Sequence, residues 1–218
     1  MSRTGGWSDT TPLCPRRFEQ LGWANVSPVI RAIGFAPHPP LIKPEVASGA
    51  AAELDDLRAA CNKLVTTLLD ISNELFIAGD QQAIDIGKWL CRDFAFQSVT
   101  EIATADAGNA LADLEKTSEE IAILVMADGS ARRSLKAPGY LDERSHAYDD
   151  AVAAALESGE AAKLAGLDSA LGTELLASGA ELWPEIGLAL SNQRWDANLL
   201  FRDDPYGVSY FVGLWVAN

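Results

Sequence analysis

The chain has 218 residues, a length typical of one medium-sized domain, and 48% of them are hydrophobic, enough to bury a sizeable core. Its 31 acidic residues against 17 basic ones give a net charge of -14, which argues against nucleic-acid and membrane-surface partners, because both bind clustered Lys and Arg. Cys14, Cys61 and Cys91 form no CxxC pair, which argues against a disulfide framework and for a reducing, cytoplasmic compartment.

Residues 1–28 mix Gly, Ser, Thr, Pro and Arg and lack the apolar centre of a signal peptide. They predict an N-terminal extension that is either poorly ordered or laid over a neighbouring chain. No apolar run is long enough to span a bilayer. Residues 29–218 predict one domain without an internal repeat or a dividing linker.

The first half of this domain alternates between strand and helix patterns. Apolar runs predict strands at 29–36, 74–79, 94–102 and 121–126. Helices are predicted at 46–70, from Asp80 through Cys91, and at 107–115; in the first of these, Leu57, Cys61 and Leu64 recur at three- and four-residue steps. Strands alternating with helices predict an α/β fold with a central, mostly parallel sheet covered by helices on both faces.

The second half becomes helical before it returns to strands. Helices are predicted at 143–156, at 168–178 with Asp168 and Ser169 as caps, and at 180–190. Strands at 199–202 and 207–216 follow, joined by a turn at 203–206. The aromatic residues of this half are expected in the core or in an interface, namely Trp183, Trp195, Trp215 and Tyr210.

Three stretches together resemble one family: APHPP at 36–40, DGSARR at 128–133 with KAPGY at 136–140, and DPYGVSYF at 204–211. They are similar to the catalytic-subunit family of class III extradiol ring-cleavage dioxygenases, in an actinobacterial branch. The resemblance covers roughly residues 29–216 and is weak at 84–119. It implies the fold of that catalytic subunit, and Fe(II) held by two His and one carboxylate, with a further His as acid/base beside a catechol-like substrate.

Only part of that ligand set has a counterpart in this chain. The resemblance places His38 at the first metal ligand, after the first strand, where ligands gather in open α/β sheets. The place of the second ligand holds Asp80 and no His, and the place of the acid/base His holds Asp128 and Ser130. The late carboxylate of the family corresponds to Asp203 or Asp204 without a unique alignment. His146 lies among charged residues and is expected to face solvent.

Each candidate residue also has a simpler interpretation. His38 could hydrogen-bond its turn between two prolines, and Asp80 could cap the following helix rather than replace a metal-binding His. Asp128 and Ser130 could shape a loop whose N–H groups face an anion, with Arg132 and Arg133 supplying positive charge. The alternative is an ordinary loop with two solvated arginines.

The resemblance leaves three functions open. The first is a divergent, inactive dioxygenase-like protein that retains a pocket for a metal or a small aromatic or anionic ligand. The second is an active Fe(II) enzyme with altered ligands, using His38, Asp80 and Asp203 or Asp204. The third is a structural or interaction subunit, as a homodimer or in a heteromeric complex.

Overall fold

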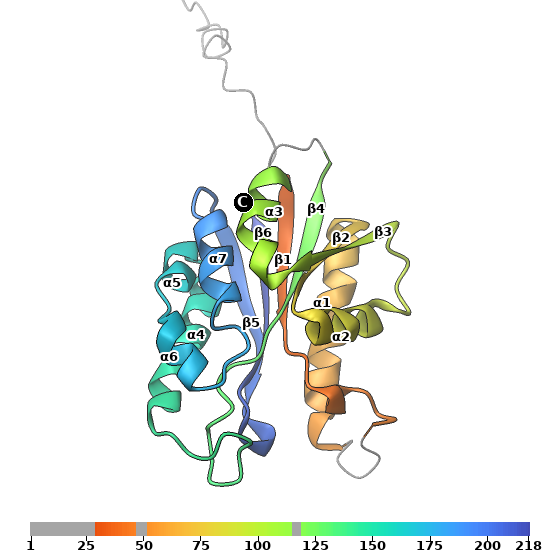
Figure 1. Ribbon diagram of the computed structural model, residues 1–218. Helices are drawn as coiled ribbons and strands as arrows, with labels where there is room; N and C mark the ends of the chain where they lie inside the picture. The colour runs from red at the N-terminus through yellow and green to blue at the C-terminus, as the bar shows by residue number, and fades with distance from the viewer. Residues whose placement is uncertain (1–28, 47–51, 115–118) are drawn as a thin grey trace, which may run out of the picture.

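The computed structural model describes residues 29–46, 52–114 and 119–218, and its centre is one mixed sheet (Figure 1). Its strand order is β3-β2-β4-β1-β6-β5. The first four strands along the chain pair in parallel, whereas β6 is antiparallel to both β1 and β5. The strands are β1 (Ile30–Ala36), β2 (Glu74–Gly79), β3 (Ser98–Ala103), β4 (Ile121–Met126), β5 (Trp195–Asp203) and β6 (Tyr210–Ala217).

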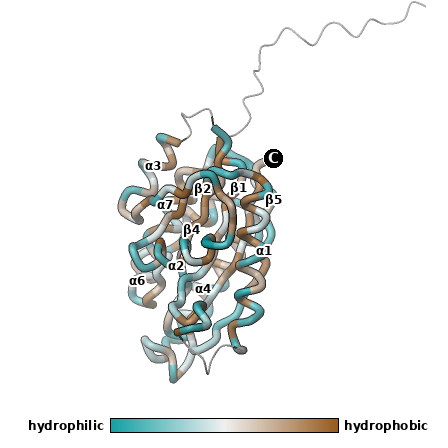
Figure 2. The backbone as a smooth tube through the Cα atoms, turned by 90° about the vertical axis from the view of Figure 1, so that its right-hand side faces the viewer, coloured by the Kyte–Doolittle hydropathy of each residue, from teal (hydrophilic) through white to brown (hydrophobic). Residues whose placement is uncertain are grey.

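Helices cover both faces of this sheet, as the sequence predicts. One face carries α1 (Asp55–Ile71) and α2 (Gln81–Cys91). The other face carries α3 (Ala107–Leu114), α4 (Arg144–Ser158), α5 (Ala161–Ala165), α6 (Ser169–Glu174) and α7 (Leu182–Ala189). Short 3-10 helices are η1 (Pro40–Ile42), η2 (Ala52–Leu54), η3 (Thr104–Asp106) and η4 (Pro205–Gly207). Figure 2 shows hydrophobic segments running through the strands between these layers. The α/β fold class is therefore confirmed.

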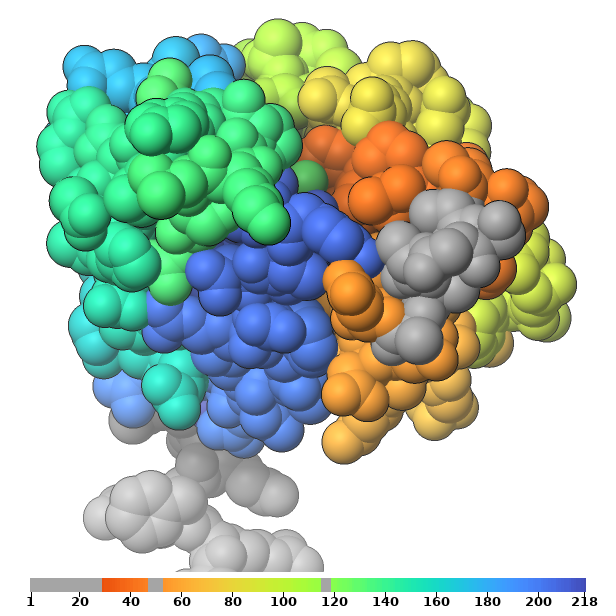
Figure 3. Space-filling view, turned by 90° about the horizontal axis from the view of Figure 1, so that it is seen from below, coloured from red at the N-terminus to blue at the C-terminus, as the bar shows by residue number. Residues whose placement is uncertain are grey.

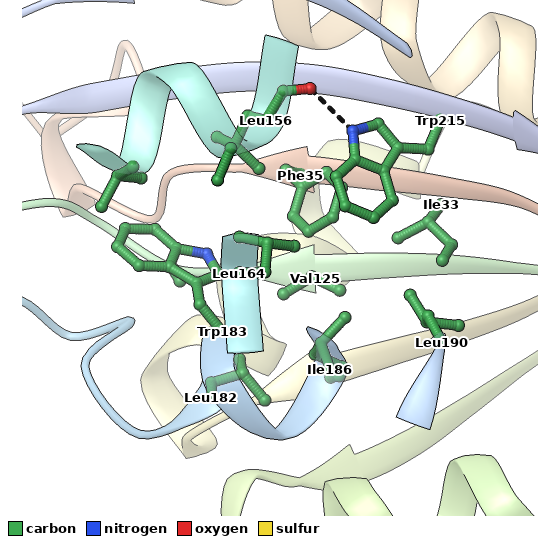
Figure 4. Close-up of a cluster of buried hydrophobic side chains, with 14 of the residues drawn as sticks. Ile33, Phe35, Val125, Leu156, Leu164, Leu182, Trp183, Ile186, Leu190 and Trp215 are labelled. Atoms are coloured by element: carbon green, nitrogen blue, oxygen red, sulfur yellow. Dashed lines mark hydrogen bonds between the residues drawn. The ribbon is translucent and has the colours of Figure 1, made fainter. Parts of the chain in front are cut away.

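Large aromatic side chains fill the core beneath α4, α5 and α7 (Figure 4). The rings of Phe35 and Trp215 meet edge to face with centroids 5.1 Å apart. The Trp215 indole N–H donates to the carbonyl of Leu156 at 2.7 Å, so its polar group is satisfied although the side chain is fully buried. The core positions expected for Trp183, Trp195 and Tyr210 are also confirmed.

The opposite core depends on the close approach of α1 to the sheet. The inward stripe of α1 is fully buried and contains the predicted Leu57, Cys61 and Leu64. At Gly34 of β1, a Cβ atom would lie 2.8 Å from the Cδ1 of Leu68. Glycine at this position therefore lets the helix pack directly on the strand.

Several predicted boundaries differ from the observed ones. The helix predicted to run to residue 178 ends at Glu174, because Leu176 adopts a left-handed φ of 59° and the N–H of Ala177 bonds back to the carbonyl of Gly172. The short helix α5 was absent from the prediction, and β5 begins at Trp195, ahead of the predicted strand. The predicted extension at 1–28 and part of the helix predicted at 46–70 lie outside the described residues. Within the described part of the chain, no helix is both long and apolar enough to cross a membrane.

Candidate functional site

The carboxyl ends of β1, β2 and β4 meet at one edge of the sheet. β4 lies between β1 and β2, and the chain leaves β4 towards the face opposite α1 and α2. A crevice forms where neighbouring strands send their connections to opposite faces, and ligands of open α/β sheets bind there. His38, Asp80 and Asp128 follow these three strands, so the sheet brings the sequence-predicted residues to this edge. Figure 3 views this end of the molecule, where the segments after β1 (orange) and β4 (green) and the β5–β6 connection (blue) meet.

His38 and Asp128 are in direct contact. The backbone N–H of His38 donates to Oδ1 of Asp128 at 2.8 Å, and the ring Nδ1 lies 3.4 Å from the same oxygen. The side chain of His38 is only 7% exposed, and its Nδ1 is buried without a hydrogen-bond partner among the described residues. The imidazole of His38 is thus held against the Asp128 carboxylate at the end of the strands. The same carboxylate also fixes the turn at His38, because it accepts the hydrogen bond from the backbone N–H of His38.

Burial raises the pKa of Asp128 above its ordinary value, and the nearby Asp80 raises it further, while His38 lowers it. The backbone of Asp128 is held from the other side by the segment before α7. Its N–H donates to the Ser178 hydroxyl at 2.7 Å, and its carbonyl accepts from the N–H of Gly179 at 3.2 Å. Asp128 therefore connects the β1 and β4 ends to the 178–181 segment.

That segment forms one wall of an open pocket of about 440 Å³, here called the strand-end pocket. Two carboxylates and three hydroxyl groups face it, and three apolar side chains complete its lining. The lining residues are Asp80, Glu181, Thr104, Thr173, Ser178, Leu176, Ala177 and Ala180. The pocket is within the size range of small-ligand sites, and its surface offers hydrogen-bond acceptors beside a small apolar wall.

Asp80 contributes to this pocket and also begins a helix. Its Oδ1 accepts a hydrogen bond from the N–H of Ala83 at 2.8 Å, so it caps α2, and the simpler interpretation of this residue is confirmed. Its side chain is otherwise exposed towards the pocket.

Ser130 lies in a different, closed cluster. It is fully buried, and its hydroxyl and N–H donate to Asp149 of α4 at 2.5 and 2.9 Å. The hydroxyl of Ser209 donates to the same carboxylate at 2.6 Å. A Cβ atom at Gly129 would lie 2.8 Å from this carboxylate, so the loop after β4 packs directly on it. These contacts anchor the loop from inside the protein.

The two arginines of the loop contact their own chain. Arg133 Nε lies 3.1 Å from Asp204 and 3.7 Å from Asp149, and its Nη1 lies 2.7 Å from Nδ1 of His146. Arg132 donates to the carbonyl of Gly139 at 2.7 Å. The expectation that His146 faces solvent is confirmed, since its side chain is exposed. Anion binding by the arginines stays a prediction, and Arg133 already faces two carboxylates.

The donor set does not fit an Fe(II) site with two imidazoles and one carboxylate. The sequence contains two histidines, and the second, His146, contacts Arg133. In residues 29–46, 52–114 and 119–218, no three His, Cys, Asp or Glu side chains are grouped so that they could hold a metal ion. Asp204, one candidate for the late carboxylate, accepts from Arg133.

Comparisons with known proteins establish no family. No family model matches the sequence, and no curated protein matches it. Among solved structures, an uncharacterized protein, JW3007 from Escherichia coli K12, is similar with a TM-score of 0.47 and 11% sequence identity. The alignment covers 85% of this chain and 99% of that one.

Several residues of this region were not identified from the sequence. Glu181, Ser178 and Thr104 are ordinary polar residues without a local pattern that marks a pocket. Asp149 did carry a signal, because it shares the inward stripe of α4 with Val152 and Leu156, where a carboxylate must find buried partners.

Proposed function

We propose that this chain is a divergent, catalytically inactive relative of the class III extradiol dioxygenase catalytic subunits, and that it binds a small hydroxylated aromatic molecule at the strand-end pocket. The resemblance at residues 36–40, 128–140 and 204–211 supports the lineage. The contact between His38 and Asp128 carries the proposal. The imidazole expected to bind iron lies against a carboxylate of its own chain, and no second imidazole accompanies it.

The absence of a second imidazole is the reason for proposing inactivity. Ring cleavage as the resemblance implies it needs two neutral imidazoles on the metal and a third as acid/base. Replacing imidazoles by carboxylates yields a harder, weaker site for Fe(II), and ring cleavage depends on the electronic properties of that iron. This chain has one imidazole at the strand ends.

The lining of the pocket favours a neutral ligand over an anionic one. Asp80 and Glu181 face the pocket, and Asp128 lies next to it, so a carboxylate or phosphate would be repelled. Phenolic hydroxyls can donate hydrogen bonds to these carboxylates, and a ring can pack on Leu176 and the two alanines. A catechol-like molecule fits both requirements.

Protein purified without an affinity tag allows a direct test. We expect no stoichiometric iron by elemental analysis and no oxygen uptake with catechol, but saturable binding of catechol by calorimetry. Protocatechuate, which adds a carboxylate to catechol, is expected to bind more weakly. Stoichiometric iron with turnover would support the active enzyme with altered ligands. The absence of saturable catechol binding would contradict the proposed ligand pocket.

A matched pair of variants tests whether catechol binds in the strand-end pocket. Glu181→Gln is expected to weaken catechol binding about tenfold, because a hydrogen bond to a charged acceptor is lost. Glu185→Gln is the control: Glu185 is also exposed on this helical segment but lines a different pocket, so its replacement is expected to leave binding unchanged. Equal effects of both variants would indicate a non-specific charge effect.

A further inference from the structure

A second cavity lies on the opposite side of the sheet from α4–α7. It has a volume of about 510 Å³ and lies between the start of α1 and the end of α2. Its lining combines aromatic, apolar and basic side chains and contains Pro44, Arg58, Asn62, Trp89, Leu90, Arg92, Asp93 and Phe94. None of these residues lines the strand-end pocket.

The charge of this cavity is opposite to that of the chain. Two guanidinium groups and one carboxylate line it, whereas the whole chain carries a net charge of -14. Arg58 serves the fold, since its Nε and Nη2 donate to the carbonyls of Ile42 and Leu41 at 2.8 and 3.0 Å. The positive charge that can serve a ligand is that of Arg92.

Arg92 is held in place by its own helix. Its guanidinium carbon lies 3.9 Å from the centre of the Trp89 ring, and its Nη1 donates to the Trp89 carbonyl at 2.7 Å. Its Nη2 lies 3.2 Å from Oδ2 of Asp93, whose side chain is 75% exposed. An ion pair so exposed contributes little, so an external carboxylate can replace Asp93 on an already oriented guanidinium.

The cavity also provides hydrogen-bond donors and aromatic surface. The side-chain amide of Asn62 and the indole N–H of Trp89 make no hydrogen bond with other described residues, and both side chains line the cavity. Phe94 is half-buried beside them. Donors next to aromatic rings suit a ligand that has acceptor oxygens on a flat apolar body.

From this arrangement we infer that the cavity binds a small aromatic carboxylate. The carboxylate lies on Arg92 and Asn62, and the ring packs against Phe94 and the edge of Trp89. This site is independent of the strand-end pocket, which takes neutral ligands, so the two proposals can fail separately.

Benzoate is the probe, added to the isotope-labelled full chain and followed by amide and indole N–H resonances. The indole signal of Trp89 is assigned from Trp89→Phe. We expect a saturable shift of this signal and of the Asn62 amide below about 10 mM benzoate. Benzylamine, which carries the opposite charge on the same ring, is expected to cause no saturable shift. No saturation with benzoate, or equal binding of both probes, would overturn the inference.

Variants at the Arg92–Asp93 ion pair are expected to change benzoate affinity in opposite directions. Arg92→Ala is expected to weaken benzoate binding about tenfold or more, and Arg92→Lys, which keeps the charge and loses the planar fork, several-fold. Asp93→Asn removes the competing carboxylate and is expected to strengthen binding. Lys163→Ala, at an exposed ion pair on α5, is the control and is expected to change nothing. Unchanged affinity in the Arg92 and Asp93 variants would refute the site, whereas Glu181→Gln should leave benzoate binding intact.

Discussion

The hydroxyl of Ser209 lies 2.6 Å from Oδ2 of Asp149, although 60 residues separate them in the chain. Asp149 belongs to α4 and Ser209 precedes β6, so this contact joins a helix to the sheet beneath it. Ser130 and Arg133 approach the same carboxylate from the loop after β4. One buried carboxylate thus holds three separate segments of the strand-end region together.

Removing this carboxylate is expected to destabilise the protein strongly. Asp149→Ala leaves two buried hydroxyls and one buried N–H without their acceptor and removes one of the two carboxylates that face Arg133, so the free energy of unfolding should fall by about 3 kcal/mol. Urea denaturation monitored by circular dichroism measures this. Asp150→Ala is the matched control: Asp150 is exposed and pairs with Arg202 at the surface, so the loss should stay below about 1 kcal/mol. A similar loss in both variants would contradict the anchoring role of Asp149.

A substitution at Leu176 is expected to stabilise the protein. The φ of 59° at Leu176 ends α6 in the left-handed region, where glycine is favoured, and half of the side chain is exposed. Leu176→Gly removes a strain of about 1–2 kcal/mol and adds backbone freedom to the unfolded chain, so a net stabilisation of about 0.5–1 kcal/mol is expected. Thermal melting measures it. Leu188→Gly, at an exposed position of α7, should destabilise by about 1 kcal/mol. Destabilisation by both variants would show that the side chain of Leu176 packs better than its exposure indicates.

The raised pKa of Asp128 predicts a dependence of stability on pH. A carboxyl group whose pKa is higher in the folded than in the unfolded state favours folding when it is protonated. This contribution is complete below the unfolded value and is lost as the pH rises through the folded value. Asp128→Asn should therefore be more stable than the parent protein at pH 7, and the difference should shrink as the pH falls to about 4.

Urea titrations of both proteins between these pH values provide the test. Asp196→Asn, at an exposed position of β5, serves as the control and should show a small difference that does not vary in this way. A constant difference for Asp128→Asn across the range would mean that this carboxyl group titrates alike in both states.

The cysteines of the described residues are expected to be unreactive in the folded protein. Burial raises the pKa of the Cys61 and Cys91 thiols to about 12, so almost no thiolate forms at pH 8. In a Cys14→Ser variant, Ellman's reagent should label neither thiol of the native protein within minutes and both after denaturation in guanidinium chloride. Rapid labelling of one native thiol would indicate local opening of α1 or α2.

The parallel half of the sheet could be predicted from local pattern. β1, β2 and β4 are mainly apolar runs that are followed by Pro37, Asp80 and Asp128, and helical periodicity separates them. The family resemblance placed His38, Asp80 and Asp128 after these strands, and His38 and Asp128 are in contact at that edge of the sheet. The local sequence pattern could not show that the β5–β6 pair adds to β1. Antiparallel pairing such as that of Ala32 with Val216 depends on contacts between distant segments.

The site itself was less predictable than the fold. A single sequence marks residues that follow strands, but it does not show which side chains face a cavity from the other layer. Glu181 and Ser178 line the pocket beyond the end of α6 at Glu174, and that ending is accompanied by a left-handed Leu176, which propensity disfavours. The partners of Arg133 could not be predicted either, because Asp149 and Asp204 belong to segments that are distant from it in the sequence.

The pairing of β6 with β1 also has a consequence for how the protein is made. β1 emerges from the ribosome before every other described strand, whereas β6 is synthesised after all of them. One edge of β1 therefore stays without its partner throughout the synthesis of the intervening helices, and an unpaired apolar strand edge is prone to aggregation. Folding intermediates that lack β6 should accordingly depend on chaperones until residues 210–217 are available.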